Sequence, residues 1–183
     1  MIQGKVKKDK IVVKKETNSE WRVLWGKGIG KNKDMRLELK PVEALYLQSR
    51  NNLKIIGEKG ELTREDLIHK FAKRKKHFWK RYLLYEDMKK RGYNLTLRTG
   101  KIELYKRGES PLSSKPIAVM IPIPALGSIK LNSLIKEVKQ AEERGLDLAL
   151  GIVDRDGTIT YYKVKEAFEK STTLKLRQKS NLS

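Results

Sequence analysis

The chain has 183 residues and a net charge of +20, from 42 lysines and arginines against 22 aspartates and glutamates. The absence of cysteine excludes disulfide bonds and thiolate chemistry. No apolar run approaches the length of a membrane span, so we expect a protein of the cytoplasm. The excess of positive charge indicates a polyanionic partner, with nucleic acid ahead of an anionic membrane. The alternative is that the charges belong to the solvated surface of a heat-adapted protein. Heat adaptation explains a high content of charged residues better than it explains an excess of positive over negative ones.

Apolar spacing in the first part of the chain predicts a small α+β domain. Its clearest elements are a helix that begins at Pro41 and a helix capped by Thr63 and Asp66. The segment 26–33, GKGIGKNK, predicts a flexible basic loop, because it lacks the Gly-Lys-Ser/Thr ending of a phosphate-binding loop. The other predicted elements are two strands within 1–15, a short helix near 18–25, and strands at 37–39 and 53–56.

A basic run at 73–76 marks the predicted boundary between two domains. We place an N-terminal α+β domain at 1–76, a C-terminal α/β domain with a central mixed sheet at 77–169, and a flexible tail at 170–183. Helical spacing of aromatic residues after the boundary predicts a core-facing helix rather than a platform for stacking bases. The elements predicted after that helix are strands at 93–97, 101–106 and 117–123, a helix at 131–145 and a hairpin at 146–165.

The closing hairpin combines a buried strand with an acidic turn. Its first strand is an apolar run at 146–153, typical of a strand buried on both faces. A tight turn follows at 154–157, and the β-branched and aromatic segment 158–164 forms the return strand. Two carboxylates at the tip, Asp154 and Asp156, are unexpected in a very basic protein, although aspartate is also simply a good turn residue.

Four segments carry a resemblance to a known family. They read LKPVEALYLQSRNNL at 39–53, YLLYEDMKKRGY at 82–93, IELYKRG at 102–108 and LALGIVDRDGTITYY at 148–162. With these segments in this order and spacing, the chain resembles the archaeal tRNA-splicing endonucleases. The resemblance implies a C-terminal domain of the restriction-endonuclease-like type and a role in removing introns from precursor tRNA.

The family cleaves RNA without a metal or other cofactor, by attack of the ribose 2′-OH on the adjacent phosphate, which leaves a 2′,3′-cyclic phosphate. In the family a tyrosine, a histidine and a lysine provide the base, the acid and the stabilising charge. On this sequence Tyr105 matches the tyrosine, but Ser113 falls at the histidine position and Leu146 at the lysine position. Serine is no acid near neutral pH and leucine has no charge. Lys115 or Arg144 could supply a cation instead, but neither replaces the missing acid. The resemblance therefore implies a structural subunit without catalytic residues of its own.

The resemblance further implies a heterotetramer of two catalytic and two structural chains. In such an assembly the hairpin tip with Asp154 and Asp156 docks into a basic cleft of the neighbouring subunit, and the strand with Tyr161 and Tyr162 pairs with a partner strand. Precursor tRNA is the other expected partner. Its phosphates are expected to contact the densest group of basic side chains. An equally good interpretation of this group is a solvated helix end without a role in RNA binding. The group consists of Lys73, Arg74, Lys75, Lys76, Lys80 and Arg81.

Two other functions remain open. One is an active homo-oligomeric ribonuclease with a rearranged active site, and the other is a non-enzymatic RNA-binding module that kept the fold. The missing histidine and lysine argue against the first, because His69 and His77 lie outside the expected active-site segments. The retained hairpin with its acidic tip argues against the second.

Overall fold

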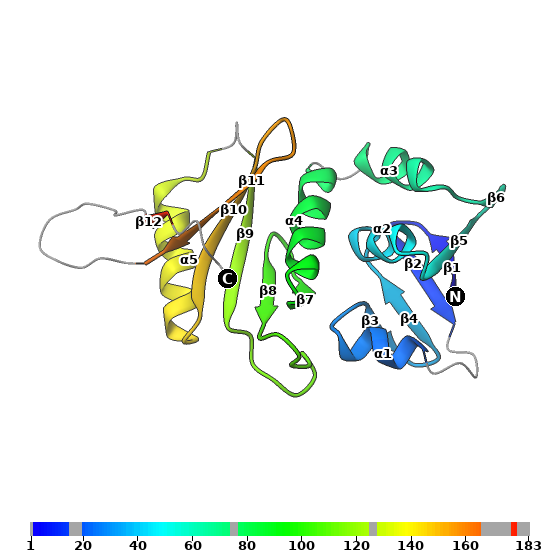
Figure 1. The fold of residues 1–183 in the computed structure, drawn as a ribbon, viewed down its shortest axis with the longest axis horizontal. Helices are drawn as coiled ribbons and strands as arrows, with labels where there is room; N and C mark the ends of the chain where they lie inside the picture. The colour runs from blue at the N-terminus through cyan, green and yellow to red at the C-terminus, as the bar shows by residue number, and fades with distance from the viewer. Residues whose placement is uncertain (1, 15–19, 74–76, 125–127, 166–176, 179–183) are drawn as a thin grey trace, which may run out of the picture. The chain divides into compact units, whose positions relative to one another are not determined.

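A computed structural model describes residues 2–14, 20–73, 77–124, 128–165 and 177–178 of the chain (Figure 1). Its contacts divide the chain into two units, Met1–Glu86 and Asp87–Ser183. This division follows Glu86, inside a helix, whereas the sequence places a domain boundary after residue 76, and that boundary stays a prediction. Each unit contains a mixed sheet. None of the helices in the described part of the chain is long and apolar enough to cross a membrane.

The first unit is built on a six-stranded sheet in the order β3-β4-β2-β1-β5-β6. Strand β1 pairs antiparallel with β2 and parallel with β5. Alternating apolar residues of these strands are buried together with apolar helix residues, among them Ile11, Leu45 and Ile55. Its elements are β1 (Ile2–Lys7), β2 (Lys10–Lys14), α1 (Glu20–Gly26), β3 (Lys31–Lys33), β4 (Arg36–Leu39), α2 (Pro41–Ser49), β5 (Leu53–Gly57), β6 (Gly60–Glu61) and α3 (Arg64–Ala72).

Helices α2 and α3 begin at the residues that the sequence predicts. Pro41 is the first residue of α2, where its missing N–H leaves no hydrogen bond unmade. Thr63 caps α3, because its hydroxyl accepts a hydrogen bond from the Asp66 amide at 3.1 Å. The Asp66 carboxylate in turn accepts from the Thr63 amide at 2.9 Å. The predicted capping box is therefore confirmed.

The segment 26–33 differs from the loop that the sequence predicts. Its last three residues form β3, which pairs with β4, and Ile29 is buried. At Gly30 φ is +80°, and a Cβ there would lie 2.8 Å from the side chains of Leu37 and Leu39. Only glycine fits this close approach, so the segment is anchored by an apolar contact that its basic composition conceals.

The second unit contains a six-stranded sheet in the order β12-β11-β10-β9-β8-β7. Strands β9 and β10 run parallel and the other neighbours run antiparallel, which confirms the predicted mixed sheet. The order of helix, two strands, strand, helix and two strands is also as predicted. The elements are α4 (Phe78–Lys90), which contains the division between the units, β7 (Asn94–Leu97), β8 (Ile102–Tyr105), β9 (Ala118–Pro124), α5 (Leu131–Glu143), β10 (Asp147–Val153), β11 (Ile159–Val164) and β12 (Arg177–Gln178).

Helix α5 runs along β10 and covers one face of this sheet (Figure 1). Its apolar stripe, which includes Leu134 and Val138, packs against Val119, Leu148 and Leu150. The burial of β10 is less complete than the predicted burial on both faces, since Ala149 and Ile152 are only half-buried. Both edges of β10 are paired, by β9 and β11. The apolar run thus predicts a central strand correctly but overstates how far its faces are covered.

Two further predictions need correction. Trp79 of the aromatic helix α4 is exposed and stacks on Tyr82 with 5.2 Å between ring centroids, whereas Phe78, Tyr82 and Tyr85 are buried as predicted. Two residues of the predicted flexible tail form β12 and pair with Tyr162 and Lys163 of β11. The other residues of 170–183 lie outside the described part of the chain.

Candidate partner-binding and RNA-binding sites

The two aspartates of the turn between β10 and β11 differ in their hydrogen bonds. The Asp154 amide donates to the Thr158 carbonyl at 2.9 Å, which closes the turn. The Asp156 carboxylate accepts from the Thr158 amide at 3.0 Å and from its hydroxyl at 2.8 Å, and these bonds hold the pKa of Asp156 below its usual value. The exposed Asp154 carboxylate makes no hydrogen bond or ion pair with the residues that the structure describes. Asp154 is therefore the tip carboxylate that is available to a partner.

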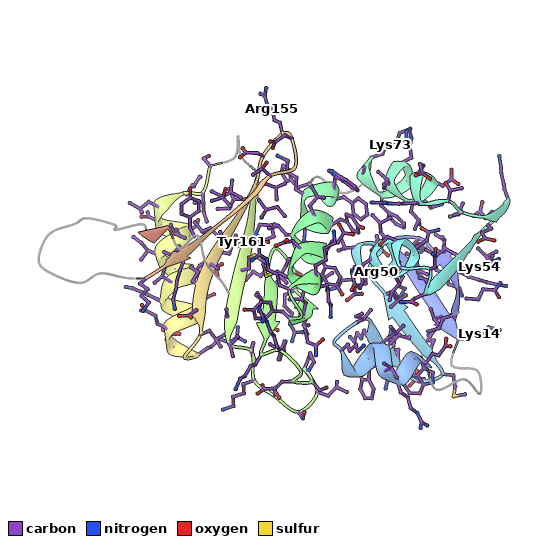
Figure 2. The ribbon with its side chains drawn as sticks, in the orientation of Figure 1. Lys14, Arg50, Lys54, Lys73, Arg155 and Tyr161 are labelled. Atoms are coloured by element: carbon purple, nitrogen blue, oxygen red, sulfur yellow. The ribbon has the colours of Figure 1, made fainter. Side chains whose placement is uncertain are left out.

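The tip is less acidic than two carboxylates would make it, because Arg155 lies between them. Figure 2 shows the Arg155 side chain extending away from the end of the β10–β11 hairpin. A partner of this tip therefore meets carboxylates and a guanidinium together, and not a purely acidic surface.

The Tyr161 side chain is bound within the second unit. Its hydroxyl donates to the Asp87 carboxylate at 2.6 Å, and Arg91 Nε donates to the same carboxylate oxygen at 2.8 Å. The Arg91 guanidinium also lies 5.5 Å from the centroid of the Tyr161 ring. Burial and the neighbouring Asp87 raise the pKa of Tyr161 well above its usual value. Contact between Tyr161 and a partner would therefore involve its backbone.

The Tyr162 side chain points to the other face of the sheet. It packs against the apolar cluster beneath α5, while its backbone pairs with Gln178 of β12. Within the described residues, β12 covers the outer edge of β11 at Tyr162 and Lys163 only. Among the described residues, no strand pairs with this edge at 159–161 or at Val164, so these positions could pair with a partner strand.

The structure shows three different settings at the positions that are predicted to correspond to the family's catalytic residues. Tyr105 is 4% exposed at the end of β8, opposite Asn94 of β7. Ser113 is exposed in the loop after β8, and its hydroxyl bonds to the Ser110 carbonyl at 3.5 Å. Leu146, 9% exposed, belongs to the apolar cluster with α5. A core leucine thus stands where the family's lysine is expected.

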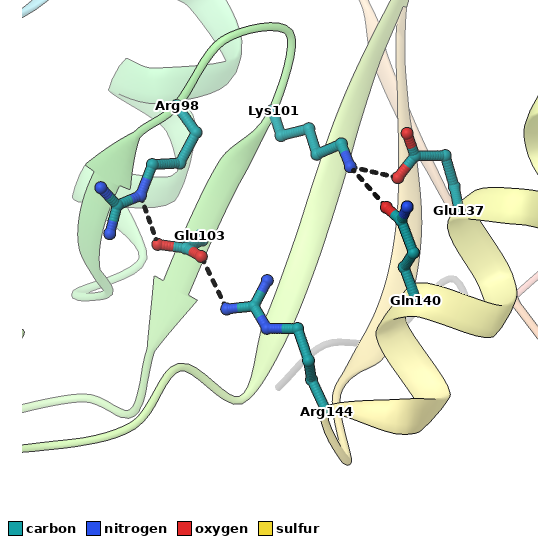
Figure 3. A network of polar contacts seen from close by, with 6 residues as sticks. All are labelled: Arg98, Lys101, Glu103, Glu137, Gln140 and Arg144. Carbon is teal, nitrogen blue, oxygen red and sulfur yellow. Dashed lines mark hydrogen bonds and ion pairs between the residues drawn. The ribbon is translucent and has the colours of Figure 1, made fainter.

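A charged cluster is centred on Glu103, which lies two residues before Tyr105 in the sequence (Figure 3). Glu103 of β8 pairs in register with Val119, which packs against α5, so Glu103 faces the α5 side of the sheet. Its carboxylate accepts from Arg98 Nε and from a terminal nitrogen of Arg144, both at 2.8 Å. Arg98 follows β7, and Arg144 is the C-cap of α5. We call these three residues the Glu103 cluster.

Charge pairing maintains the ionised state of this cluster. Burial opposes ionisation of Glu103, but the hydrogen bonds from Arg144 and Arg98 outweigh it and hold the pKa of the Glu103 carboxyl below its usual value. The bond to Glu103 also raises the pKa of Arg98. The sequence signal for the cluster is a single acidic residue inside the apolar strand IELY. A buried carboxylate needs partners, and only the fold identifies them.

The predicted basic surface is described only in part. Lys73 is exposed directly after α3, as Figure 2 shows, whereas Lys80 and Arg81 of α4 are half-buried. Burial lowers the pKa of the Arg81 guanidinium. Three of the predicted RNA-binding residues lie outside the described residues: Arg74, Lys75 and Lys76.

Metal-binding geometry is absent from the part of the chain that the structure describes. No group of three or more histidine, aspartate or glutamate side chains there is placed to hold a metal ion.

Family models match both parts of the chain. Residues 2–68 match the tRNA intron endonuclease N-terminal domain, and residues 72–174 match the Sen15 protein family. The chain belongs to the tRNA-splicing endonuclease family. The family resemblance predicted from four sequence segments is therefore confirmed.

Several proteins named tRNA-splicing endonuclease are similar in sequence to most of this chain. It is 30% identical to one from Methanosarcina mazei over 171 residues, which are 93% of the chain and 48% of the relative. It is 31% identical to one from Thermococcus gammatolerans over 139 residues, which are 74% of the chain and 81% of the relative. A relative from Methanothermobacter thermautotrophicus is 29% identical over 161 residues and is covered to 92%. The chain spans about half the length of the Methanosarcina relatives.

Proposed function

We propose that this chain is a non-catalytic subunit of a tRNA-splicing endonuclease. In this proposal it assembles with a catalytic subunit, two copies of each, and the complex removes introns from precursor tRNA in the cytoplasm. The cleaved RNA carries 2′,3′-cyclic phosphate ends. Membership of the family and the name shared by its relatives support the reaction.

The observation that carries the non-catalytic role is the setting of Leu146. Its side chain packs in the apolar cluster beneath α5, so the position provides no charge for a reacting phosphate. Ser113 offers a hydroxyl in place of an imidazole, and Tyr105 is buried. Because one general acid alone contributes roughly 10²–10⁴-fold to a rate, the loss of acid and cation together predicts background activity.

The chain's contribution is then assembly and RNA-binding surface. The exposed Asp154 carboxylate at the hairpin tip and the backbone of β11 supply the contacts to the catalytic subunit. Exposed basic residues such as Lys73 supply phosphate contacts that are independent of sequence and sensitive to salt.

The test is reconstitution of cleavage with a chain of this family that carries the tyrosine, histidine and lysine. We expect neither purified chain to cleave an intron-bearing precursor tRNA alone, and the mixture to cleave it at both splice sites. Full cleavage by the other chain without this one would contradict the proposal. Cleavage by this chain alone, lost in Tyr105→Phe, would instead establish the homo-oligomeric ribonuclease.

A further inference from the structure

The Glu103 cluster contains more positive charge than its buried acid requires. One carboxylate bonds to two guanidinium groups, so the cluster has an excess of one positive charge. A single arginine would balance Glu103. The second therefore gives the cluster a net charge that attracts an anion from outside the chain.

Exposure divides the cluster into a buried anchor and two accessible cations. The Glu103 side chain is 7% exposed, whereas the side chains of Arg98 and Arg144 are 60% and 52% exposed. Each arginine is bonded to Glu103 through one nitrogen, and Arg98 is also hydrogen-bonded to Tyr105. A guanidinium has five N–H donors in a planar fork that fits a phosphate. Both guanidinium groups thus remain accessible to a ligand while their bonds to Glu103 hold them in place.

The backbone around the cluster is fixed at three points. Arg98 and Lys101 close the β7–β8 turn through backbone hydrogen bonds, with Gly100 at φ +72°. Lys101 then bridges from this turn to α5, where its ammonium is paired with Glu137 and lies 3.5 Å from the Gln140 amide oxygen (Figure 3). Arg144 caps the same helix. Less side-chain entropy is lost when a ligand binds to arginines that are already held.

We propose that Arg98 and Arg144, held by Glu103, bind a backbone phosphate of RNA. This inference rests on the proposed function, which makes RNA the substrate. Glu103 lies on the same strand as Tyr105, two residues away, and Arg144 lies two residues before Leu146. The predicted catalytic positions thus lack the histidine and the lysine, but the nearby arginines provide a cationic group that recognises a phosphodiester.

The chain offers a matched control for this cluster. Glu38 of β4 is also mostly buried and lies near two cations, at 2.8 Å from Lys10 Nζ and 3.9 Å from Arg36 Nε. Here the close partner is a lysine, which has no planar fork, and the arginine is at the limit of an ion pair. The two clusters have the same formal charge, so they differ in geometry rather than in total charge.

The first experiment measures the binding of precursor tRNA to the full chain at several salt concentrations. The triple variant Arg98→Gln, Glu103→Gln, Arg144→Gln removes the charges and leaves no buried ion unpaired. The control is Lys10→Gln, Arg36→Gln, Glu38→Gln. We expect the first variant to lose about tenfold in affinity, as for one charge-assisted hydrogen bond. Its salt slope should fall by about 0.7–0.9 for each phosphate that is no longer bound, while the control binds as the wild type does. Circular dichroism and thermal melting verify folding of both.

A milder variant keeps the proposal testable if the triple variant does not fold. Arg98→Lys with Arg144→Lys retains both charges and the pairing with Glu103 but removes the planar forks. We expect it to bind precursor tRNA more weakly than the wild type with little change in salt slope. Wild-type affinity in this variant would overturn the proposal.

The second experiment observes the arginines directly. The Nε–H signals of Arg98 and Arg144 are followed by NMR during titration with a dinucleoside monophosphate, and separately with inorganic phosphate. We expect both signals to shift with the phosphodiester at lower concentration than with inorganic phosphate. Equal response to both ligands, or no response to the RNA fragment, would overturn the proposal.

The outcomes separate this inference from the proposed function. If the wild type supports cleavage with its partner and the Gln variant binds and supports cleavage equally well, only the phosphate site is wrong. If the wild type neither binds precursor tRNA nor supports cleavage, the proposed function itself is wrong, and the phosphate site is rejected with it.

Discussion

Glu103 shows how one residue changes the character of an apolar strand. Its neighbours Ile102 and Leu104 are buried on the opposite face, while Glu103 is buried with its charge paired to Arg98 and Arg144. An unpaired carboxylate at this depth would be strongly destabilising, whereas removal of both charge types can be nearly neutral. The paired state is therefore the reason the strand tolerates an acid.

This pairing makes part of the stability dependent on pH. The pKa of Glu103 is lower in the folded chain than its ordinary value of 4.5, so its stabilisation is fully present above that value and is lost as pH falls through the folded-state pKa. We expect Glu103→Gln to lower the free energy of unfolding by about 1.5–3 kcal/mol at neutral pH. The difference from wild type should shrink as the pH falls below about 4.5 and through the lowered pKa of Glu103. Urea titrations at each pH measure it.

The control for this prediction is Glu143→Gln. Glu143 is exposed beside Arg144 and has no hydrogen bond or ion pair with the described residues. Its substitution should change stability little at either pH. A Glu103→Gln effect that stays constant between neutral and acidic pH would show that the carboxylate charge does not stabilise this fold.

At the scale of elements, the Tyr161 side chain links β11 to the helix α4. Tyr161 reaches Asp87 in the last turns of α4, on the sheet face opposite α5. We expect Tyr161→Phe to lower the free energy of unfolding by roughly 1–2 kcal/mol, since it removes a hydrogen bond to a charged group. Amide hydrogen exchange should reveal this destabilisation as faster exchange along β11.

The adjacent tyrosine provides a matched control. Tyr162 packs beneath α5 through its ring, and its hydroxyl makes no hydrogen bond with the described residues. Tyr162→Phe should therefore leave both stability and exchange close to wild type. Equal effects of the two substitutions would mean that the Asp87 hydrogen bond contributes nothing specific.

At the scale of the whole molecule, the proposed assembly relies on a small hairpin tip in a chain of net charge +20. Asp156 stabilises its own turn, so reversal of its charge would disturb the turn as well as any interface. Asp154→Lys changes the accessible carboxylate alone. If this carboxylate docks against basic residues of the catalytic subunit, we expect association to weaken by roughly 2–5 kcal/mol without loss of fold. Size-exclusion chromatography of the mixture detects it.

The matched substitution for the tip is Glu58→Lys. Glu58 is exposed in the turn between β5 and β6, and its reversal changes the net charge by the same amount. We expect this variant to co-elute with the catalytic subunit at full occupancy. If Asp154→Lys also co-elutes at full occupancy, the tip is not a docking element.

The sequence by itself determined the order of elements in the second half of the chain, the capping box at Thr63 and the membership of the family. These features depend on short-range periodicity, local hydrogen bonding and segment order, which a linear sequence records directly. The same reasoning missed β3, because an apolar contact of Ile29 is hidden within a basic segment. It also placed Trp79 in the core, because helical spacing predicts which side of a helix is buried but not which residues at the edge of that side are exposed.

Only the tertiary structure decided which side chains meet across long separations. Glu103 and Arg144 are 41 positions apart, and Tyr161 and Asp87 are 74 positions apart. Such contacts depend on strand register and on the placement of helices over the sheet, and no local pattern encodes them. The assignment of residues to the family's catalytic positions thus stays a prediction from the sequence, while the fold alone placed two arginines around a buried glutamate.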